Sequence, residues 1–188
     1  MKKMSTKNER EQLIDWLDLF SVRSGEEFTL ASGQKSNVYV DVKKTAFHHQ
    51  AGRLLAKLLC DKMIEKFSPV DAVAGVVLGG CHLASIVSMQ HPLGVDVFYV
   101  RKEAKEHGTK NLIERPYMTE YQSVVVLEDV VTTGASALAA AKLLEKEKFD
   151  VKGILAVVDR RAKKGPYIGG TFDSFPFIAL IDFEELHP

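Results

Sequence analysis

The stretch VVVLEDVVTTGASAL, residues 124 to 138, decides the fold of this chain. It opens with four apolar residues, three of them β-branched, and continues through two adjacent acids, Glu128 and Asp129. A continuous β-branched run suits a strand that is covered on both faces, as the parallel strands of an α/β sheet are. The Thr-Thr-Gly-Ala-Ser segment that follows is typical of a helix start. The stretch therefore predicts a buried strand that turns directly into a helix.

Similar apolar runs recur on both sides of this stretch, with segments of helical spacing between them. The additional runs cover residues 70–78, 94–100, 151–158 and 176–181, and the helical segments cover 49–67, 80–91 and 135–149. Strands that alternate with helices imply right-handed crossover connections. We therefore predict an α/β fold with a mostly parallel five-stranded sheet flanked by helices.

The N-terminal part of the chain shows a different pattern. An amphipathic helix is predicted around residues 8–22, and FTLASGQKSNVYVDVK, residues 28–43, alternates around a central SGQKSN turn. That alternation indicates an antiparallel hairpin, which we expect to sit beside the main sheet as a small cap. A length of 188 residues, with no repeat and no linker-like composition, favours a single domain over residues 1–188.

The composition excludes several classes of protein. Lys plus Arg and Asp plus Glu are both 25, so the net charge is zero and a broad nucleic-acid-binding surface is not expected. Cys60 and Cys81 are too few for a disulfide scaffold, and no Cys/His cluster has zinc-ligand spacing. The sequence shows neither a signal-peptide core nor an apolar run of ~20 residues, so we expect a cytoplasmic protein without membrane contact.

The turn after the 124–127 run carries the chemistry. Thr132, Thr133, Gly134 and Ser136 supply hydroxyls, a flexible backbone and unpaired N–H groups at the positive end of a helix dipole, which suits a phosphate. The acids before it can accept hydrogen bonds from sugar hydroxyls or bind Mg²⁺ through water. A ribose 5-phosphate fits both parts. The alternative is an ordinary helix cap behind two solvated acids.

VVVLEDVVTTGAS resembles the phosphoribosyl pyrophosphate binding motif of the type I phosphoribosyltransferases. The resemblance implies the fold of that family, with a small N-terminal hood, and a donor site along the whole segment, with Asp129 also catalytic. The donor-binding residues that it implies here are Glu128, Asp129, Val130, Val131, Thr132, Thr133, Gly134, Ala135 and Ser136.

A second loop, RKEAKEHGTKNLIE at residues 101–114, is rich in positive charge and holds a histidine that titrates near neutrality. An arbitrary run of this kind would be a solvated surface loop. Its RKEAKEHG segment, however, closely resembles the mobile catalytic loop of the orotate phosphoribosyltransferase family. That resemblance implies that the donor is bound by Arg101, Lys102, Lys105 and His107. It also implies that Lys102, Lys105 and His107 are catalytic.

Three further segments carry the same resemblance. FTLASGQKSNVYVD, residues 28–41, is similar to the family's hood hairpin, and DAVAGVVLGG, residues 71–80, is similar to the short loop that receives pyrophosphate. VVDRR, residues 157–161, is similar to the strand end whose arginine meets the orotate carboxylate, so Arg160 is implied to bind orotate together with Thr132. The hood would comprise about residues 1–45 and the C-terminal segment, and the core about residues 46–160.

The chain also departs from the family pattern. Some members carry one lysine before the hood's Ser-Gly and another in the pyrophosphate loop, where this chain has Ala31 and Gly79. Two expected cations are therefore missing. Lys35, Lys43 and Lys44 are candidates to replace them.

The resemblance implies transfer of a phosphoribosyl group to N1 of orotate in pyrimidine synthesis, with Mg²⁺ held by substrate and water near the two acids and without direct side-chain ligands. It also implies a homodimer whose active sites are shared. The alternatives are a related enzyme acting on a purine base, or a non-catalytic regulator that senses phosphoribosyl pyrophosphate and binds RNA. The roles of Cys81 and His82 stay open, whereas Cys60 is expected to be a buried thiol.

Overall fold

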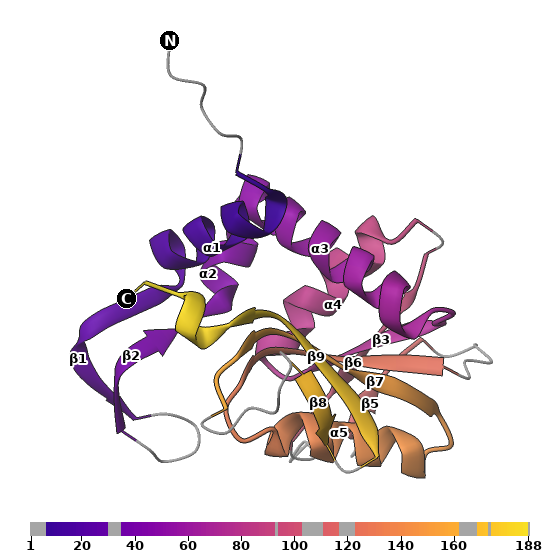
Figure 1. The fold of residues 1–188 in the computed structure, drawn as a ribbon. Helices are drawn as coiled ribbons and strands as arrows, with labels where there is room; N and C mark the ends of the chain where they lie inside the picture. The colour runs from indigo at the N-terminus through magenta and orange to yellow at the C-terminus, as the bar shows by residue number, and fades with distance from the viewer. Residues whose placement is uncertain are drawn as a thin grey trace.

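The computed structural model describes residues 7–29, 35–92, 94–102, 111–116, 123–161, 169–172 and 174–187. The described part contains a two-stranded sheet and a seven-stranded sheet, and helices cover both faces of the larger one (Figure 1). The strands of the larger sheet are β3 (Ala72–Val76), β4 (Asp96–Val100), β5 (Ile113–Glu114), β6 (Ser123–Val131), β7 (Asp150–Asp159), β8 (Gly169–Phe172) and β9 (Phe175–Asp182). Their spatial order is β5-β4-β3-β6-β7-β9-β8.

The five predicted strands form the parallel centre of this sheet. β4, β3, β6, β7 and β9 pair in parallel, which confirms the predicted α/β architecture. The prediction of five strands was incomplete, because β5 pairs antiparallel with β4 at one edge and β8 pairs antiparallel with β9 at the other. β5 is only two residues long and β8 begins with two glycines, so neither has the β-branched run from which a strand is predicted.

The helices agree with the spacing of apolar residues. The predicted helices correspond to α1 (Glu9–Phe20), α3 (His49–Phe67), α4 (Gly79–Gln90) and α5 (Ala135–Lys146). The last ends three residues before its predicted end at residue 149. One helix was missed, α2 (Val42–Phe47), whose six residues are too few to show a helical period. No helix among the described residues is long and apolar enough to cross a membrane.

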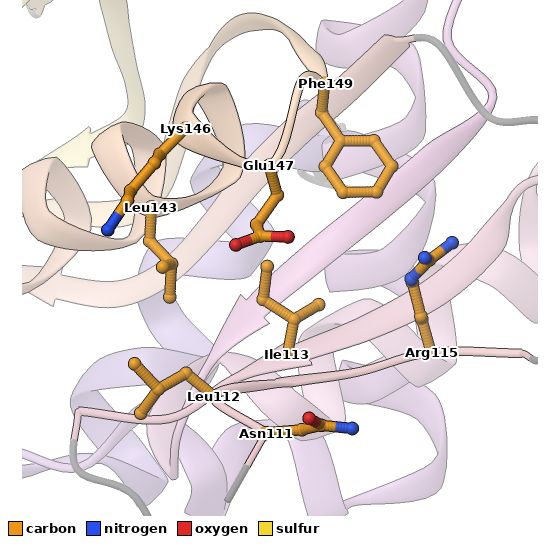
Figure 2. Close-up of a pocket in the computed structure, with 8 residues that line it drawn as sticks. All are labelled: Asn111, Leu112, Ile113, Arg115, Leu143, Lys146, Glu147 and Phe149. Atoms are coloured by element: carbon orange, nitrogen blue, oxygen red, sulfur yellow. The ribbon is translucent and has the colours of Figure 1, made fainter.

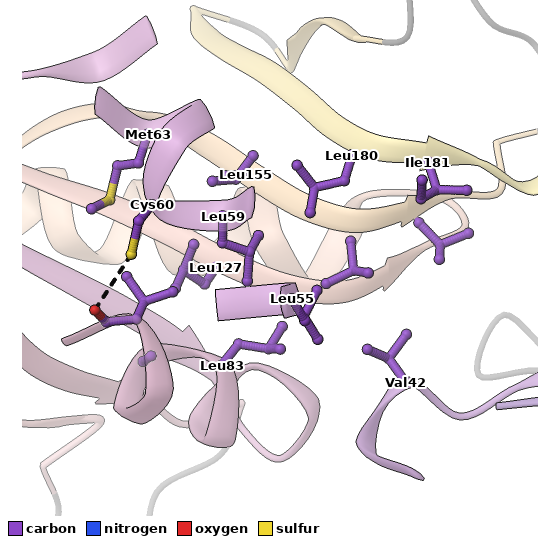
Figure 3. Close-up of a cluster of buried hydrophobic side chains, with 14 of the residues drawn as sticks. Val42, Leu55, Leu59, Cys60, Met63, Leu83, Leu127, Leu155, Leu180 and Ile181 are labelled. Atoms are coloured by element: carbon purple, nitrogen blue, oxygen red, sulfur yellow. Dashed lines mark hydrogen bonds between the residues drawn. The ribbon is translucent and has the colours of Figure 1, made fainter. Parts of the chain in front are cut away.

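The side chains of the central strands alternate between two cores. Val73, Leu127 and Leu155 face the side covered by α1, α3 and α4, and Figure 3 shows the two leucines with their partners on α3. Ala74 and Val126 face the other side, which α5 covers. Because both faces are buried, the strands carry continuous apolar runs, as the sequence indicated.

Cys60 belongs to the first of these cores. It is 3% exposed, and its Sγ lies 3.6 Å from the carbonyl oxygen of Val87, to which the thiol donates (Figure 3). Burial raises the pKa of this thiol to about 11. The expectation of a buried thiol is confirmed.

The N-terminal hairpin forms the small sheet. β1 (Val22–Thr29) pairs antiparallel with β2 (Lys35–Val40), so the predicted hairpin is confirmed, although its first strand begins at Val22 rather than at residue 28. The start of its turn, with Ala31, lies outside the described residues. The C-terminal turn η1 (Phe183–Glu185) is tied to α1 by Arg10, which donates to both carboxylate oxygens of Glu185 at 2.7 and 2.5 Å.

Candidate active site

The predicted site residues gather at one edge of the large sheet. Parallel strands end at the same edge, so the segments that follow β3, β4, β6 and β7 lie next to one another there. These segments carry Gly79, Lys102, the 128–136 stretch and Arg160. The structure therefore brings together the predicted residues that fall within its described part.

The two acids lie within the end of β6 rather than after it. The strand continues to Val131, and Glu128 still pairs in register with Ala156 of β7. The prediction that the strand ends at residue 127 was therefore too short. Pairing to β7 fixes the backbone of both acids, so they form a rigid wall of the site.

The turn from β6 to α5 forms a small cavity. It has a volume of about 130 Å³ and is lined by Lys102 and by residues 128–137. Gly134 is the residue before α5 and has a φ of 80°, a left-handed conformation that side chains disfavour. A Cβ atom at this position would also lie 2.2 Å from the Phe172 ring. Only glycine therefore fits this turn, whose N–H groups are left at the start of a helix.

Glu128 is a buried acid. It is only 8% exposed, and burial, reinforced by the neighbouring charge of Asp129, raises its pKa to about 9. Glu128 therefore keeps its proton at neutral pH in the free protein. A protonated carboxyl can donate one hydrogen bond and accept others, so it suits a sugar hydroxyl.

Asp129 faces the start of α4. Its Oδ1 accepts a hydrogen bond of 2.8 Å from the N–H of Val130. Its Oδ2 would lie only 2.2 Å from a Cβ atom at Gly79, the first residue of α4. Any side chain at position 79 would push the carboxylate away. The glycine at this position therefore lets Asp129 lie against the start of α4, the segment that resembles the family's pyrophosphate loop.

The described base of the second loop comprises Arg101 and Lys102. Arg101 is anchored to the returning strand, because its Nε donates to Glu114 at 3.2 Å and its N–H donates to the carbonyl of Leu112 at 2.8 Å. Lys102 is exposed, lines the cavity at the phosphate turn and lowers the pKa of Glu128 by its charge. Lys105 and His107 lie outside the described residues.

Arg160 connects the main sheet to the hood. Its N–H donates to the carbonyl of Val131 at 2.8 Å, and its Nη2 donates to Ser36 Oγ on β2 at 2.6 Å. Its guanidinium carbon lies 4.3 Å from the centre of the Phe183 ring. Among the described residues it has no carboxylate partner, in contrast to Arg161, which pairs with Asp159 at 2.7 Å. Arg160 is thus free to bind an added carboxylate.

Ser36 and Phe183 were missed by the sequence analysis. Ser36 was read as a residue of a hairpin turn, and Phe183 lies more than twenty residues beyond Arg160. Their role depends on the hood and the C-terminal turn meeting at the end of β7. No local pattern carries that information.

The open candidates differ in position. Lys35 pairs with Glu27 at 2.5 Å on the surface, whereas Lys43 is half-buried and pairs with Asp41 at 2.5 Å.

Burial raises the pKa of the Cys81 thiol, which argues against a nucleophile. Burial also lowers the pKa of His82, so this side chain is neutral at pH 7.

A separate cavity lies at the other end of α5, away from the phosphate turn. It has a volume of about 360 Å³, and Figure 2 shows its lining, with Glu147 and Leu143 from the end of α5 opposite Ile113 and Asn111. None of the predicted site residues lines it among the described part of the chain. Of these two cavities, the one at the β6–α5 turn is the one that matches the motif.

Comparison with known proteins identifies the family. The phosphoribosyl transferase domain family matches residues 43–183. The orotate phosphoribosyltransferase of Listeria innocua is 40% identical over 176 residues, which is 94% of this chain and 82% of that protein.

Solved structures agree. Mycobacterium tuberculosis orotate phosphoribosyltransferase in complex with Fe(III) dicitrate superposes with a TM-score of 0.76 at 30% identity, over 96% of this chain and 99% of that one. The same enzyme in complex with phosphoribosyl pyrophosphate gives a TM-score of 0.72 at 28% identity, over 94% and 98%. With the matching turn and Arg160 at one sheet edge, these relatives establish that the chain belongs to the orotate phosphoribosyltransferase family of type I phosphoribosyltransferases.

Proposed function

We propose that this chain transfers the 5-phosphoribosyl group of phosphoribosyl pyrophosphate to N1 of orotate, releasing pyrophosphate and forming orotidine 5'-phosphate for UMP synthesis. One observation carries this proposal: the glycine turn before α5 lies at the same sheet edge as the guanidinium of Arg160, which has no carboxylate partner among the described residues. The first suits a phosphate and the second suits a planar carboxylate.

The donor sugar is held by the β6–α5 turn. The N–H groups and hydroxyls of residues 132–136 bind the 5-phosphate, helped by the dipole of α5. Asp129 accepts hydrogen bonds from the ribose hydroxyls. Glu128 donates a hydrogen bond to the same hydroxyls through its O–H group, because its pKa of about 9 keeps the carboxyl protonated at neutral pH.

The departing pyrophosphate needs positive charge. As it leaves, the sugar becomes cation-like and negative charge grows on the pyrophosphate oxygens, so catalysis depends on positioning and on neutralising that charge. Lys102, with Lys105 and His107 farther along the same loop, supplies cations, and Arg101 anchors the base of the loop. The N–H groups of Gly79 and Gly80 at the start of α4 add further donors.

The site also suits Mg²⁺. Two neighbouring acidic side chains, Asp129 and the protonated Glu128, lie beside the β6–α5 turn, and Asp129 lies against the start of α4. Mg²⁺ usually keeps several waters and binds through one or two carboxylates together with substrate phosphates. Glu128 and Asp129 would hold the hydrated ion through water, and the bound ion would supply positive charge to the pyrophosphate.

The acceptor is held by Arg160 and Thr132. The guanidinium group can donate two parallel hydrogen bonds to the orotate carboxylate, which fixes the orientation of the ring as well as its place. Ser36 Oγ accepts from Nη2 and so restrains the guanidinium before orotate binds. The ring is thereby held with N1 towards the sugar of the donor.

The test is an ultraviolet assay of orotate consumption in the presence of phosphoribosyl pyrophosphate, with and without Mg²⁺. We expect orotate loss that requires both, and no comparable donor consumption with adenine, guanine or uracil. Turnover with a purine base instead would overturn the proposal. So would RNA binding without any turnover, which would indicate the regulator.

We further propose a single-domain, cytoplasmic protein that works as a homodimer with shared active sites. Exposed apolar side chains support such a contact: Phe47 on α2 is 68% exposed, and Met89 on α4 is 87% exposed. Mixing Lys105→Ala protein with Arg160→Ala protein should then restore activity through hybrid sites. If the subunits exchange and the mixture stays inactive, the sites are not shared.

A further inference from the structure

Two cations expected from the family pattern are absent at Ala31 and Gly79, so the hood side of the pyrophosphate site needs another source of positive charge. We propose that Lys43, on α2, contacts the pyrophosphate of the donor from the side opposite to Lys102, as a catalytic residue. This inference rests on the proposed function and identifies a residue of that same site.

The backbone at Lys43 is firmly placed. The N–H of Asp41 donates to the carbonyl of Ser21 at 2.8 Å, and Val42 is fully buried in the core. Thr45, on the next turn of α2, is also fully buried and shares a hydrogen bond of 2.6 Å with Ser21 Oγ. α2 packs against α4 and β6, the two elements that carry the pyrophosphate loop and the acid pair.

The side chain of Lys43 is largely shielded from solvent. Its side chain is 26% exposed, compared with 69% for Lys35, which pairs with Glu27 on the hood surface. Lys44, one residue on, is exposed. Of the three lysines that could replace the missing cations, Lys43 is the least exposed, and its charge interacts with that of Asp129.

The charges around Lys43 fix its state. Asp41, whose Oδ1 lies 2.5 Å from Lys43 Nζ, raises the pKa of Lys43, and the charge of Asp129 raises it further. These effects outweigh desolvation, so Lys43 is charged at neutral pH. The charge of Lys102 in turn lowers the pKa of Glu128. Each of the two acids therefore has a lysine charge close to it, Lys43 for Asp129 and Lys102 for Glu128.

Gly79 explains why the cation comes from α2. A side chain at position 79 would displace the Asp129 carboxylate, which lies 2.2 Å from the place of its Cβ. With glycine at position 79, the Asp129 carboxylate stays against the start of α4. Lys43 of α2 then supplies the positive charge that a side chain at position 79 cannot. Asp41 Oδ1 is buried and has no hydrogen-bond partner among the described residues apart from the ion pair with Lys43. Asp41 thus acts as a positioning residue for the ammonium group.

The first measurement is calorimetric binding of inorganic pyrophosphate with Mg²⁺, beside binding of ribose 5-phosphate. Lys43→Ala should weaken pyrophosphate binding about 10- to 100-fold, the range expected for a lost hydrogen bond to a charged group. Binding of ribose 5-phosphate, whose phosphate lies in the 132–136 turn, should not change. Lys44→Ala is the matched control and should bind both as the wild type does.

Steady-state kinetics give the second readout. Lys43→Ala should raise KM for phosphoribosyl pyrophosphate and lower kcat, with KM for orotate unchanged, and Lys43→Arg should restore most of the loss. If Lys43 only neutralised Asp41, the double variant Asp41→Asn/Lys43→Ala would recover wild-type kinetics. We expect this double variant to remain defective.

The outcomes separate the two proposals. A wild-type protein that consumes no orotate would overturn the proposed function, whereas the pyrophosphate titration would still report on Lys43. Wild-type pyrophosphate binding by Lys43→Ala, or recovery in the double variant, would overturn the role of Lys43 alone.

Discussion

The phosphate turn and the Arg160 site lie at the same sheet edge but are assembled differently. The turn is one continuous segment, residues 128–136, whose shape is set by β6 pairing and by Gly134. The Arg160 site combines β2, the end of β7 and η1, and its residues Ser36 and Arg160 are 124 positions apart in the chain. A contiguous site depends on local backbone geometry, whereas an assembled site depends on how the hood docks. Changes in the turn should therefore affect the donor, and changes around Arg160 should affect the acceptor.

The largest expected effect is in the turn. Asp129→Asn removes the charge that faces the pyrophosphate loop while keeping the shape of the side chain. We expect kcat/KM for phosphoribosyl pyrophosphate to fall about 10²- to 10³-fold, as for the loss of a preorganised electrostatic contact. KM for orotate should stay near the wild-type value in the same assay. Activity close to wild type would mean that Asp129 does not touch the donor.

Arg160→Ala should have the next largest effect, and on the other substrate. Loss of a charge-assisted pair to the orotate carboxylate is expected to raise KM for orotate about 10- to 100-fold. Arg161→Ala is the neighbouring comparison, because that side chain is paired with Asp159 inside the sheet. It should lower the melting temperature while leaving KM for orotate nearly unchanged. Equal effects on KM would contradict the assignment of the carboxylate to Arg160.

Ser36→Ala tests whether the Arg160 site is truly assembled across the hood. Removing the hydroxyl frees Nη2, so the guanidinium is less restrained before orotate binds. A neutral hydrogen bond contributes modestly, so we expect KM for orotate to rise about 2- to 10-fold, with binding of ribose 5-phosphate unchanged. A change in donor binding instead would show that the two sites are not separate.

The smallest effect on activity should come from Glu128→Gln, since glutamine resembles the protonated acid present at neutral pH. The pKa of Glu128 is raised from 4.5 to about 9 in the folded protein, so the unfolded chain loses this proton first. The free energy of unfolding of the wild type should therefore fall as pH rises from 4.5 to 9, relative to the variant. Denaturant titrations of both proteins without metal would measure this. The account would be contradicted if the difference in free energy of unfolding between the variant and the wild type did not grow with pH. Glu128 would then lie in a more polar environment than the structure indicates.

The same contrast explains what could be predicted from the sequence. The turn from β6 into α5 was predicted correctly, because its strand, its acids and its helix start lie in one stretch of chain, although the strand continues to Val131. The contact between Ser36 and Arg160 could not be predicted, because it depends on the hood meeting the end of β7. The electrostatic interaction of Lys43 with Asp129 could not be predicted for the same reason: α2 is too short to show a pattern, and its neighbours come from elsewhere in the sequence.

The central claim is that the turn before α5 holds the 5-phosphate of the donor. A crystal structure of the protein with phosphoribosyl pyrophosphate, Mg²⁺ and orotate tests it most directly. We expect the 5-phosphate to accept hydrogen bonds from the backbone N–H groups of residues 132–136, and the orotate carboxylate to lie on Arg160. A donor bound elsewhere, for example in the cavity at the far end of α5 shown in Figure 2, with this turn vacant, would contradict the account.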